Sequence, residues 1–319
     1  MRPWIEKLFG SVENVRAQRI VRVTNRVTYE GALFNELRAR RPMEAKGADD
    51  VRAEIAKSEG DPFCHPETGT PADAFGRIRG AHAITASNIA KYDGFHGVLV
   101  FDHHDPTAPI DAARLADYLA TCRRWADTAH STDPDARYYF LMWNSLWRAG
   151  GSIVHGHMQM TVTRGSHYPK VEALREAAMR YRARYDADYF DDLIAAHDAL
   201  GLVRRIGDVA VLASLVPIKE RELVVIGPRG ADERGLETAL AAAVGAHRAL
   251  GVLSWNMALY RAPLEDDGRD WSALRTQARL VDRGDPANRT SDIGAMELYA
   301  ASVVSSDPFR VIDAVVSPT

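Results

Sequence analysis

Short runs of alternating or consecutive apolar residues recur along this chain and predict strands. Apolar residues spaced three and four apart predict amphipathic helices at residues 111–130 and 232–250, and the long charged segment 169–200 predicts a helix or a pair of helices. A helical stretch is also expected in the tail, residues 292–315, where it could pack back over a functional site. The strands are expected at residues 18–34, 82–88, 96–102, 137–144, 153–163, 208–214, 222–227 and 252–262.

The order of these elements is repeated. Strand, strand, helix, strand occurs once before residue 165 and again after residue 205 with similar spacing, which predicts a pseudo-duplicated α+β protein. We therefore expect an N-terminal half (1–165), a helical connector (166–204) and a C-terminal half (205–319).

One of the predicted strands carries an unusual set of polar side chains. If residues 153–163 are extended, alternate side chains point to opposite faces. One face is then apolar and predicts a core contact, whereas the other holds two imidazoles and a carboxamide, a row that can bind phosphate, bind a metal or attack phosphorus. The alternative is a pair of histidines satisfied by their neighbours in a half-buried strand. The apolar face comprises Val154, Gly156, Met158, Met160 and Val162, and the polar face comprises Ile153, His155, His157, Gln159 and Thr161.

Composition narrows the classes of function. The chain has 319 residues, of which 46% are hydrophobic and 26% charged, as in globular proteins with ample core. A net charge of −3 gives no general attraction to nucleic acid or to an anionic membrane, so neither is expected as a partner. There are two cysteines, Cys64 and Cys122, and no apolar run long enough for a signal peptide or a membrane span. These features predict a cytoplasmic enzyme.

The polar strand and the residues before it resemble the galactose-1-phosphate uridylyltransferase family, in the nucleotidyltransferase branch of the histidine-triad superfamily. The spacing of Asn144, Ser152, His155, His157 and Gln159 matches the family's Asn, Ser and His-x-His-x-Gln motif. The resemblance implies two histidine-triad-like halves, with the chemistry in the first, and a homodimer. It also implies that His157 is the nucleophile, which forms a uridylyl-imidazole, and that Gln159 supports the transferred phosphate.

The same resemblance implies a set of nucleotide- and phosphate-binding residues. They are Arg38, Arg41, Asn88, Asn144, Gly151 and Ser152. The arginines match the family's Arg-x-x-Arg-Pro segment, and the glycines before Ser152 are expected to offer flexible backbone with free N–H groups to an anion. Taken alone, the arginines also fit a solvated charge cluster, and Asn88 and Ser152 also fit turn caps.

A structural zinc site is implied as well. In the family, a Cys-x-x-Cys pair, a later His and the first His of His-x-His hold the metal. The corresponding residues here are Asp61, Cys64, His103 or His104, and His155. A carboxylate is a less typical zinc ligand than the thiolate it replaces, and the alternative is a core thiol beside the end of a strand. No organic cofactor is implied.

The chemistry also follows from the residues themselves. A neutral imidazole is a competent nucleophile toward phosphorus at neutral pH. Attack by His157 on the α-phosphorus of a nucleoside diphosphate sugar would release a sugar 1-phosphate, and a second sugar phosphate would then collect the nucleotide. We expect a backbone carbonyl near His155 to orient the ring of His157, because one ring nitrogen must stay free.

The leading interpretation is a UDP-sugar:sugar-1-phosphate uridylyltransferase of galactose metabolism. Gly156 stands where the family has Pro, and Ile89-Ala90 stand where it has residues near the uridine, so the base and the sugar stay open. The alternatives are a dinucleoside polyphosphate phosphorylase, a nucleotide hydrolase and a nucleotide-binding module without turnover.

Overall fold

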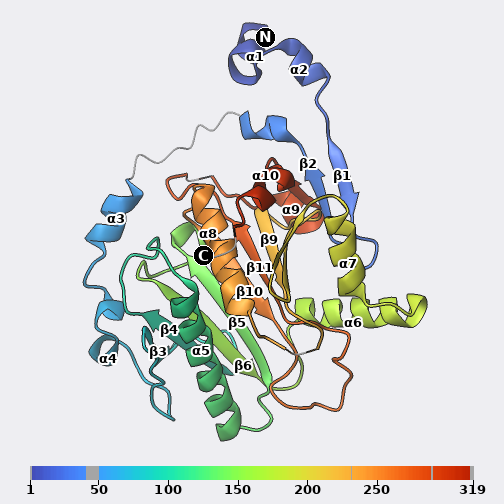
Figure 1. Cartoon of the computed structure of the whole chain (residues 1–319). Helices are drawn as coiled ribbons and strands as arrows, with labels where there is room; N and C mark the ends of the chain where they lie inside the picture. Colours follow the sequence, from blue (N-terminus) through green and yellow to red (C-terminus); the bar gives the residue numbers. More distant parts are fainter. Residues whose placement is uncertain (1, 41–49, 231, 289, 317–319) are drawn as a thin grey trace.

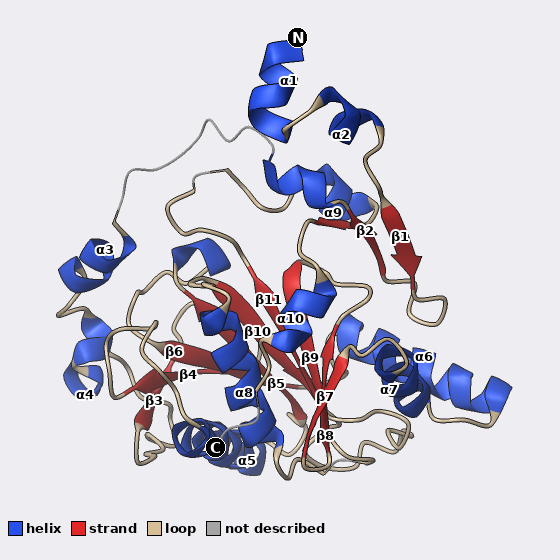
Figure 2. Cartoon of the chain, turned by 45° about the horizontal axis from the view of Figure 1, so that its top comes forward, coloured by secondary structure: helices blue, strands red, loops and turns tan. Residues whose placement is uncertain are grey.

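The computed structural model describes residues 2–40, 50–230, 232–288 and 290–316, and its centre is a nine-stranded antiparallel sheet (Figure 1, Figure 2). The N-terminal half supplies β3 (Ala83–Ser87), β4 (Phe95–Phe101), β5 (Tyr138–Ser145) and β6 (His157–Thr163). The C-terminal half supplies β7 (Val203–Ile206), β8 (Val209–Ala213), β9 (Glu220–Ile226), β10 (Trp255–Tyr260) and β11 (Gln277–Asp282). The strand order is β3-β4-β6-β5-β10-β11-β9-β8-β7, so the two halves join through the pairing of β5 with β10.

The two halves repeat one arrangement on either side of the β5–β10 pair. In each half two strands pair, a helix follows, and two more strands return between that pair and the centre of the sheet. The helices, α5 (Ala112–Thr132) and α8 (Leu236–Ala249), pack side by side on one face (Figure 1). Beneath them Trp143 and Trp255 are in contact, with ring centroids 4.2 Å apart, and each is followed by an asparagine. The predicted α+β class and duplication are confirmed.

The apolar face predicted for the histidine strand lies against these helices. Met158, Met160 and Val162 are fully buried and belong to the same core as α5 and α8. Because apolar burial stabilises by about 25 cal/mol per Å², this contact fixes which face of β6 is turned inward. The odd-numbered residues of β6 therefore point to the opposite face of the sheet.

The opposite face is covered unevenly. α6 (Pro169–Tyr185) and α7 (Tyr189–Asp198) pack over strands of the C-terminal half and bury Val171 and Phe190. The charged segment 169–200 thus forms the expected helix pair, interrupted where Asp186 adopts a left-handed conformation with φ of 52°. Over β3 and β4 the cover is smaller, with Phe63 of η2 (Pro62–Cys64) packed on the strands.

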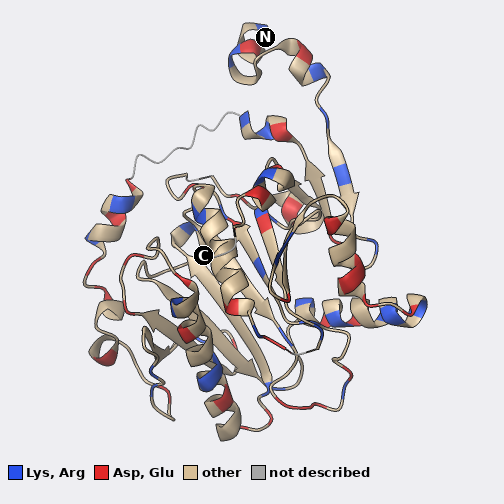
Figure 3. Ribbon diagram, viewed as in Figure 1, with Lys and Arg blue, Asp and Glu red and all other residues tan. Residues whose placement is uncertain are grey.

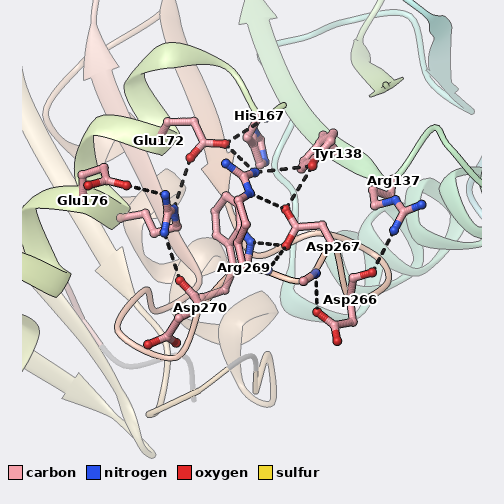
Figure 4. A network of polar contacts seen from close by, with 12 residues as sticks. Arg137, Tyr138, His167, Glu172, Glu176, Asp266, Asp267, Arg269 and Asp270 are labelled. Carbon is pink, nitrogen blue, oxygen red and sulfur yellow. Dashed lines mark hydrogen bonds and ion pairs between the residues drawn. The ribbon is translucent and has the colours of Figure 1, made fainter. Parts of the chain in front are cut away.

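The loop between β10 and β11 is tied to α6 by a network of ion pairs (Figure 4). Arg269 lies 2.8 Å from Glu172 and 2.8 Å from Asp267, and its guanidinium lies over the ring of Trp271. Tyr138, the first residue of β5, donates a hydrogen bond to Asp267 over 3.0 Å. The network therefore joins the connector and the first half to the second half.

The N-terminal segment and the tail form a separate small sheet. β1 (Val21–Thr24) and β2 (Gly31–Phe34) pair antiparallel, and β12 (Ser302–Val304) runs parallel to β2. α9 (Ala295–Tyr299) precedes β12 and α10 (Pro308–Asp313) follows it, while α1 (Arg2–Phe9) and α2 (Val12–Arg16) lie apart from the large sheet (Figure 1). The helical stretch expected in the tail is wrong at its centre, because the β-branched pair Val303 and Val304 extends along β2.

Two strands of the large sheet, β7 and β11, were not expected from the sequence pattern. In β11 the alternation of buried Ala278 and Leu280 is obscured by Arg279, a charged residue that is itself mostly covered.

The remaining short elements are η1 (Glu36–Arg40), α3 (Val51–Lys57), α4 (Pro66–Gly69) and η3 (Trp147–Ala149). Charged residues of both signs are spread over α3, α5 and α6 (Figure 3). Among the described residues, no helix has both the length and the apolar character needed to cross a bilayer.

We expect Gly97→Ala to destabilise the fold by about 1–3 kcal/mol through overpacking. A Cβ at Gly97 in β4 would lie 2.5 Å from the indole of Trp125, which cannot withdraw easily because its Nε1 donates to Asp73 over 2.7 Å. The control is Gly245→Ala in α8, where no atom lies within 4 Å and the helix should gain up to about 1 kcal/mol. Urea unfolding of both variants is the measurement, and equal stabilities would contradict the close packing of α5 on β4.

Candidate active site

His157 is the first residue of β6, not a residue in the middle of a strand. The strand expected at 153–163 begins four residues late, because the chain at Gly156 passes tightly beneath Phe101. Gly156 donates its N–H to the carbonyl of His104 and accepts from the N–H of Phe101, and a Cβ at this position would lie 2.6 Å from the Phe101 ring. The ring of His155 turns toward Cys64, its neighbour in the metal site that the resemblance implies.

The ring of His157 is held in one orientation and one tautomer. Its Nδ1 lies 2.8 Å from the carbonyl oxygen of His155, and since a carbonyl only accepts, Nδ1 carries the proton and Nε2 carries the lone pair. The expected orienting carbonyl is confirmed. Burial lowers the pKa of His157, although the hydrogen bond to His155 raises it, so the imidazole is neutral at pH 7. Phe63 packs edge-on against the ring, with centroids 5.2 Å apart.

His155 faces a cluster of four groups that suit a metal ion. Ligand atoms of Asp61, Cys64, His104 and His155 lie within 4.8 Å of one another. Nδ1 of His104 is 3.3 Å from the Cys64 sulfur and Nδ1 of His155 is 3.5 Å from it. Of the two histidines considered from the sequence, His104 joins the cluster, whereas His103 pairs with Asp102 at 3.1 Å.

The outer hydrogen bonds of the cluster leave its inner nitrogens free to bind a cation. Nε2 of His155 donates to the carbonyl of Phe101 and Nε2 of His104 donates to the carbonyl of Ile55, both over 2.9 Å. Each Nδ1 is therefore unprotonated in the neutral ring and directed at Cys64. One thiol, two imidazoles and one carboxylate are a donor set that zinc accepts.

Gln159 lies on the same face as His157 and contacts a residue that was not identified from the sequence, His96 of β4. Nδ1 of His96 accepts the backbone N–H of Tyr92 over 3.0 Å, so its proton is on Nε2, which lies 3.0 Å from the carboxamide oxygen of Gln159. The side-chain amide of Asn88 lies beside this pair, 3.3 Å from that Nε2. The sequence offered one signal for His96, a single histidine in the otherwise apolar segment 95–101. In the structure this histidine is fully buried.

This contact determines which way the Gln159 carboxamide points. Because His96 presents a donor, the oxygen of Gln159 faces it and the amide nitrogen points away. Burial lowers the pKa of His96, which keeps the ring neutral and this arrangement intact at pH 7.

Asn144 and the turn that follows it are held by the C-terminal half. The carboxamide oxygen of Asn144 accepts from Asn256 of β10 over 2.7 Å. The expectation of free N–H groups in the glycine turn is wrong for Gly150 and Gly151, which donate to Trp147 and Leu146 within the turn. Ser152 is exposed at its end.

The structure describes one of the two predicted arginines. Arg38 is exposed on η1, which follows β2 of the small sheet, and Arg41 lies outside the described residues. A cavity of about 1050 Å³ opens between α3 and α8, and His104 is the member of the cluster that lines it.

The fold is shared with several solved structures. An ADP-glucose phosphorylase from Arabidopsis thaliana, solved with bound ADP-glucose, superposes with a TM-score of 0.72 and 15% identity over 93% of this chain and 98% of that one. A GalT-like protein from Arabidopsis thaliana gives a TM-score of 0.66 and 15% identity, covering 92% and 98%. A uridylyltransferase gives 0.63 and 14%, covering 93% and 97%. The fold implied by the resemblance in sequence is confirmed. No protein-family model and no curated protein matches the chain by sequence.

We expect opposite tautomers on His157 and His96. His157 carries its proton on Nδ1 because that atom faces a carbonyl, and His96 carries it on Nε2 because its Nδ1 faces an N–H group. Long-range ¹H–¹⁵N NMR of protein labelled with ¹⁵N-histidine is the measurement, and His157→Ala and His96→Gln assign the two signals. An Nε2–H pattern for His157 at neutral pH would contradict the orientation assigned to its ring.

Proposed function

We propose that this protein is a nucleotidyltransferase that acts through a covalent nucleotidyl-His157. The observation that carries the proposal is the neutral His157 ring, with Nδ1 bonded to the His155 carbonyl and its lone pair on Nε2. An imidazole in this state attacks phosphorus without first losing a proton. The fold shared with a uridylyltransferase and an ADP-glucose phosphorylase supports this chemistry.

The reaction proceeds in two displacements. Nε2 of His157 attacks the α-phosphorus of a nucleoside diphosphate sugar, the P–N bond forms, and the bond to the bridging oxygen breaks to release sugar 1-phosphate. The imidazole gains positive charge, which the His155 carbonyl stabilises through the proton on Nδ1. A phosphate oxygen of the acceptor then attacks the same phosphorus, and the P–N bond breaks to restore neutral His157.

The polar residues around His157 are proposed to bind the transferred phosphate. Gln159 presents its amide nitrogen, since its oxygen is occupied by His96, and Asn144 presents its own, since its oxygen is occupied by Asn256. Donors fixed in this way stabilise charge on the non-bridging oxygens without reorganising. Ser152, at the end of the glycine turn, is proposed as a third donor, and Asn88 as a contact to the nucleotide.

The leading substrates are a UDP-sugar and a sugar 1-phosphate such as galactose 1-phosphate. A second candidate is transfer from an ADP-sugar to inorganic phosphate, favoured by two observations. The residues after Asn88 are Ile89 and Ala90, which depart from the pattern near uridine, and the solved structure with bound ADP-glucose superposes with a TM-score of 0.72. A cytoplasmic homodimer belongs to the proposal, in which Arg38, exposed on η1, is available to the site of a second copy.

The test is intact-protein mass spectrometry after incubation with UDP-glucose, UDP-galactose, ADP-glucose or diadenosine tetraphosphate. We expect a UMP adduct that is absent in His157→Ala, which should also lower turnover by about 10⁴-fold or more. Gln159→Ala should keep the adduct and slow its formation by about 10²-fold, as loss of one donor to a transition-state oxyanion does.

Other adducts decide between the alternatives. An AMP adduct from ADP-glucose, discharged by inorganic phosphate, would favour the second candidate, and one from diadenosine tetraphosphate would favour a dinucleoside polyphosphate phosphorylase. Discharge by water alone would indicate a hydrolase. Nucleotide binding without an adduct from any donor would reject the transferase and leave a binding module.

We also propose that Asp61, Cys64, His104 and His155 hold a structural zinc ion. Its chemistry would be to neutralise the thiolate and fix the two imidazoles, and the ring of His155 would in turn hold the carbonyl that bonds His157. Purified protein should contain about one zinc per chain by elemental analysis. Cys64→Ser should weaken zinc binding by more than about 10-fold and lower the melting temperature. His103→Gln, beside the cluster but outside it, should retain the metal, and equal zinc content in both variants would contradict the assignment.

A further inference from the structure

The C-terminal half lacks the histidines but reaches the candidate active site at one point, Asn256. In the pairing of β5 with β10, Asn256 lies directly opposite Asn144, and the two side chains are hydrogen bonded. Within the second half Val281 of β11 lies opposite Asn256, so no imidazole stands beside it. Asn144 and Asn256 are equivalent residues of the two halves. Asn144 lies on the strand next to the one that carries His157, whereas Asn256 has Val281 beside it and bonds to Asn144 instead.

The orientation of Asn256 is set by groups that can only donate or only accept. A guanidinium nitrogen of Arg283 lies 2.6 Å from the carboxamide oxygen of Asn256, and because arginine only donates, that oxygen must face it. Asp292 in the tail holds the same guanidinium with two hydrogen bonds of 2.7 and 2.9 Å. Both partners of this ion pair are largely covered, at 17% and 15% exposure, so the contact is better defined than a surface ion pair.

The amide nitrogen of Asn256 is then directed at the first half. It donates to the oxygen of Asn144 over 2.7 Å and to the carbonyl of Ala149 over 2.8 Å. The first bond turns the amide nitrogen of Asn144 away from Asn256. The second ties down the turn that leads into Gly150 and Gly151.

The loop after β11 holds the same turn from another side. Arg148 donates to the carbonyls of Arg283 and Asn288, each over 2.6 Å, and the indole of Trp147 donates to the carbonyl of Pro286 over 3.0 Å. The turn needs such support because Leu146 has a positive φ of 65°, a conformation that costs about 1 kcal/mol or more for a residue with a side chain.

We propose that Asn256, aligned by Arg283 and Asp292, is a positioning residue for the phosphate-binding side of the site. It keeps the Asn144 carboxamide with its N–H groups available to the transferred phosphate and holds the glycine turn closed. The role rests on the proposed function, because it acts on the nucleotidyl phosphate bound beside His157. The second half of the duplicated fold thus completes the site of the first.

Asn256→Asp tests the orientation with little change in size. An aspartate cannot donate to Asn144 or Ala149, so the Asn144 carboxamide should reverse and present its oxygen to the phosphate. We expect the first-turnover rate of adduct formation, measured by mass spectrometry with the donor that labels the wild type, to fall by about 10- to 100-fold, with KM changed less than kcat. Arg283→Met should show a similar loss, and Arg283→Lys should recover part of it because lysine keeps a donor for Asn256.

The control is Arg204→Met, which removes an exposed ion pair with Asp313 in the same half and should leave the rate unchanged. Melting temperatures of all variants separate a loss of orientation from a loss of folding. Rates within twofold of wild type for Asn256→Asp and Arg283→Met would overturn the positioning role while the transferase stands. A wild-type protein that forms no adduct with any donor would overturn the proposed function and this role with it.

Discussion

The hydrogen bond from Nδ1 of His157 to the carbonyl of His155 is the contact on which the site depends. Residues 155 and 156 lie just before β6, where the chain at Gly156 passes closely against Phe101. Phe101 accepts the His155 ring nitrogen and also packs against Gly156. The Asp61, Cys64 and His104 group holds the other side of that ring. The two alternate histidines thus differ in their surroundings: His157 is the proposed nucleophile, and His155 supplies the carbonyl that orients it.

Hydrogen bonds from neighbouring residues fix the orientation of two side-chain carboxamides in the site, those of Gln159 and Asn144. Neither glutamine nor asparagine has an intrinsic preference for which end it presents to a ligand. His96, with its tautomer set by a backbone N–H group, donates a hydrogen bond to the oxygen of Gln159. Asn256, aligned by Arg283, donates one to the oxygen of Asn144. Both amide nitrogens are left for an anion, although the chain as a whole carries a net charge of −3. Local dipoles, not overall charge, make the proposed site suitable for phosphate.

The two halves of the duplicated fold contribute different parts of the candidate site. The first half carries the histidines and the metal-type cluster, where rings and thiol must approach closely. The second half supports the glycine turn. Strand β10 continues the sheet beyond β5, and Asn256 and the 283–288 loop form hydrogen bonds with residues of that turn. A single sheet of nine strands and the tryptophan contact between β5 and β10 join the two halves.

The sequence by itself determined the inner face of β6 and the helices above it, because period-two and period-3.6 patterns of apolar residues are local and survive any tertiary arrangement. The resemblance of its motif to a known family grouped His157, Gln159 and Asn144 as candidate site residues. The sequence did not show that β6 begins only at His157, since the tight passage of Gly156 under Phe101 joins residues far apart in the chain. Nor did it reveal His96, Asn256 or Arg283, which meet the site only through strand pairing and loop packing. Which atoms of a polar side chain face a ligand is decided by such partners, and only the tertiary structure brings them together.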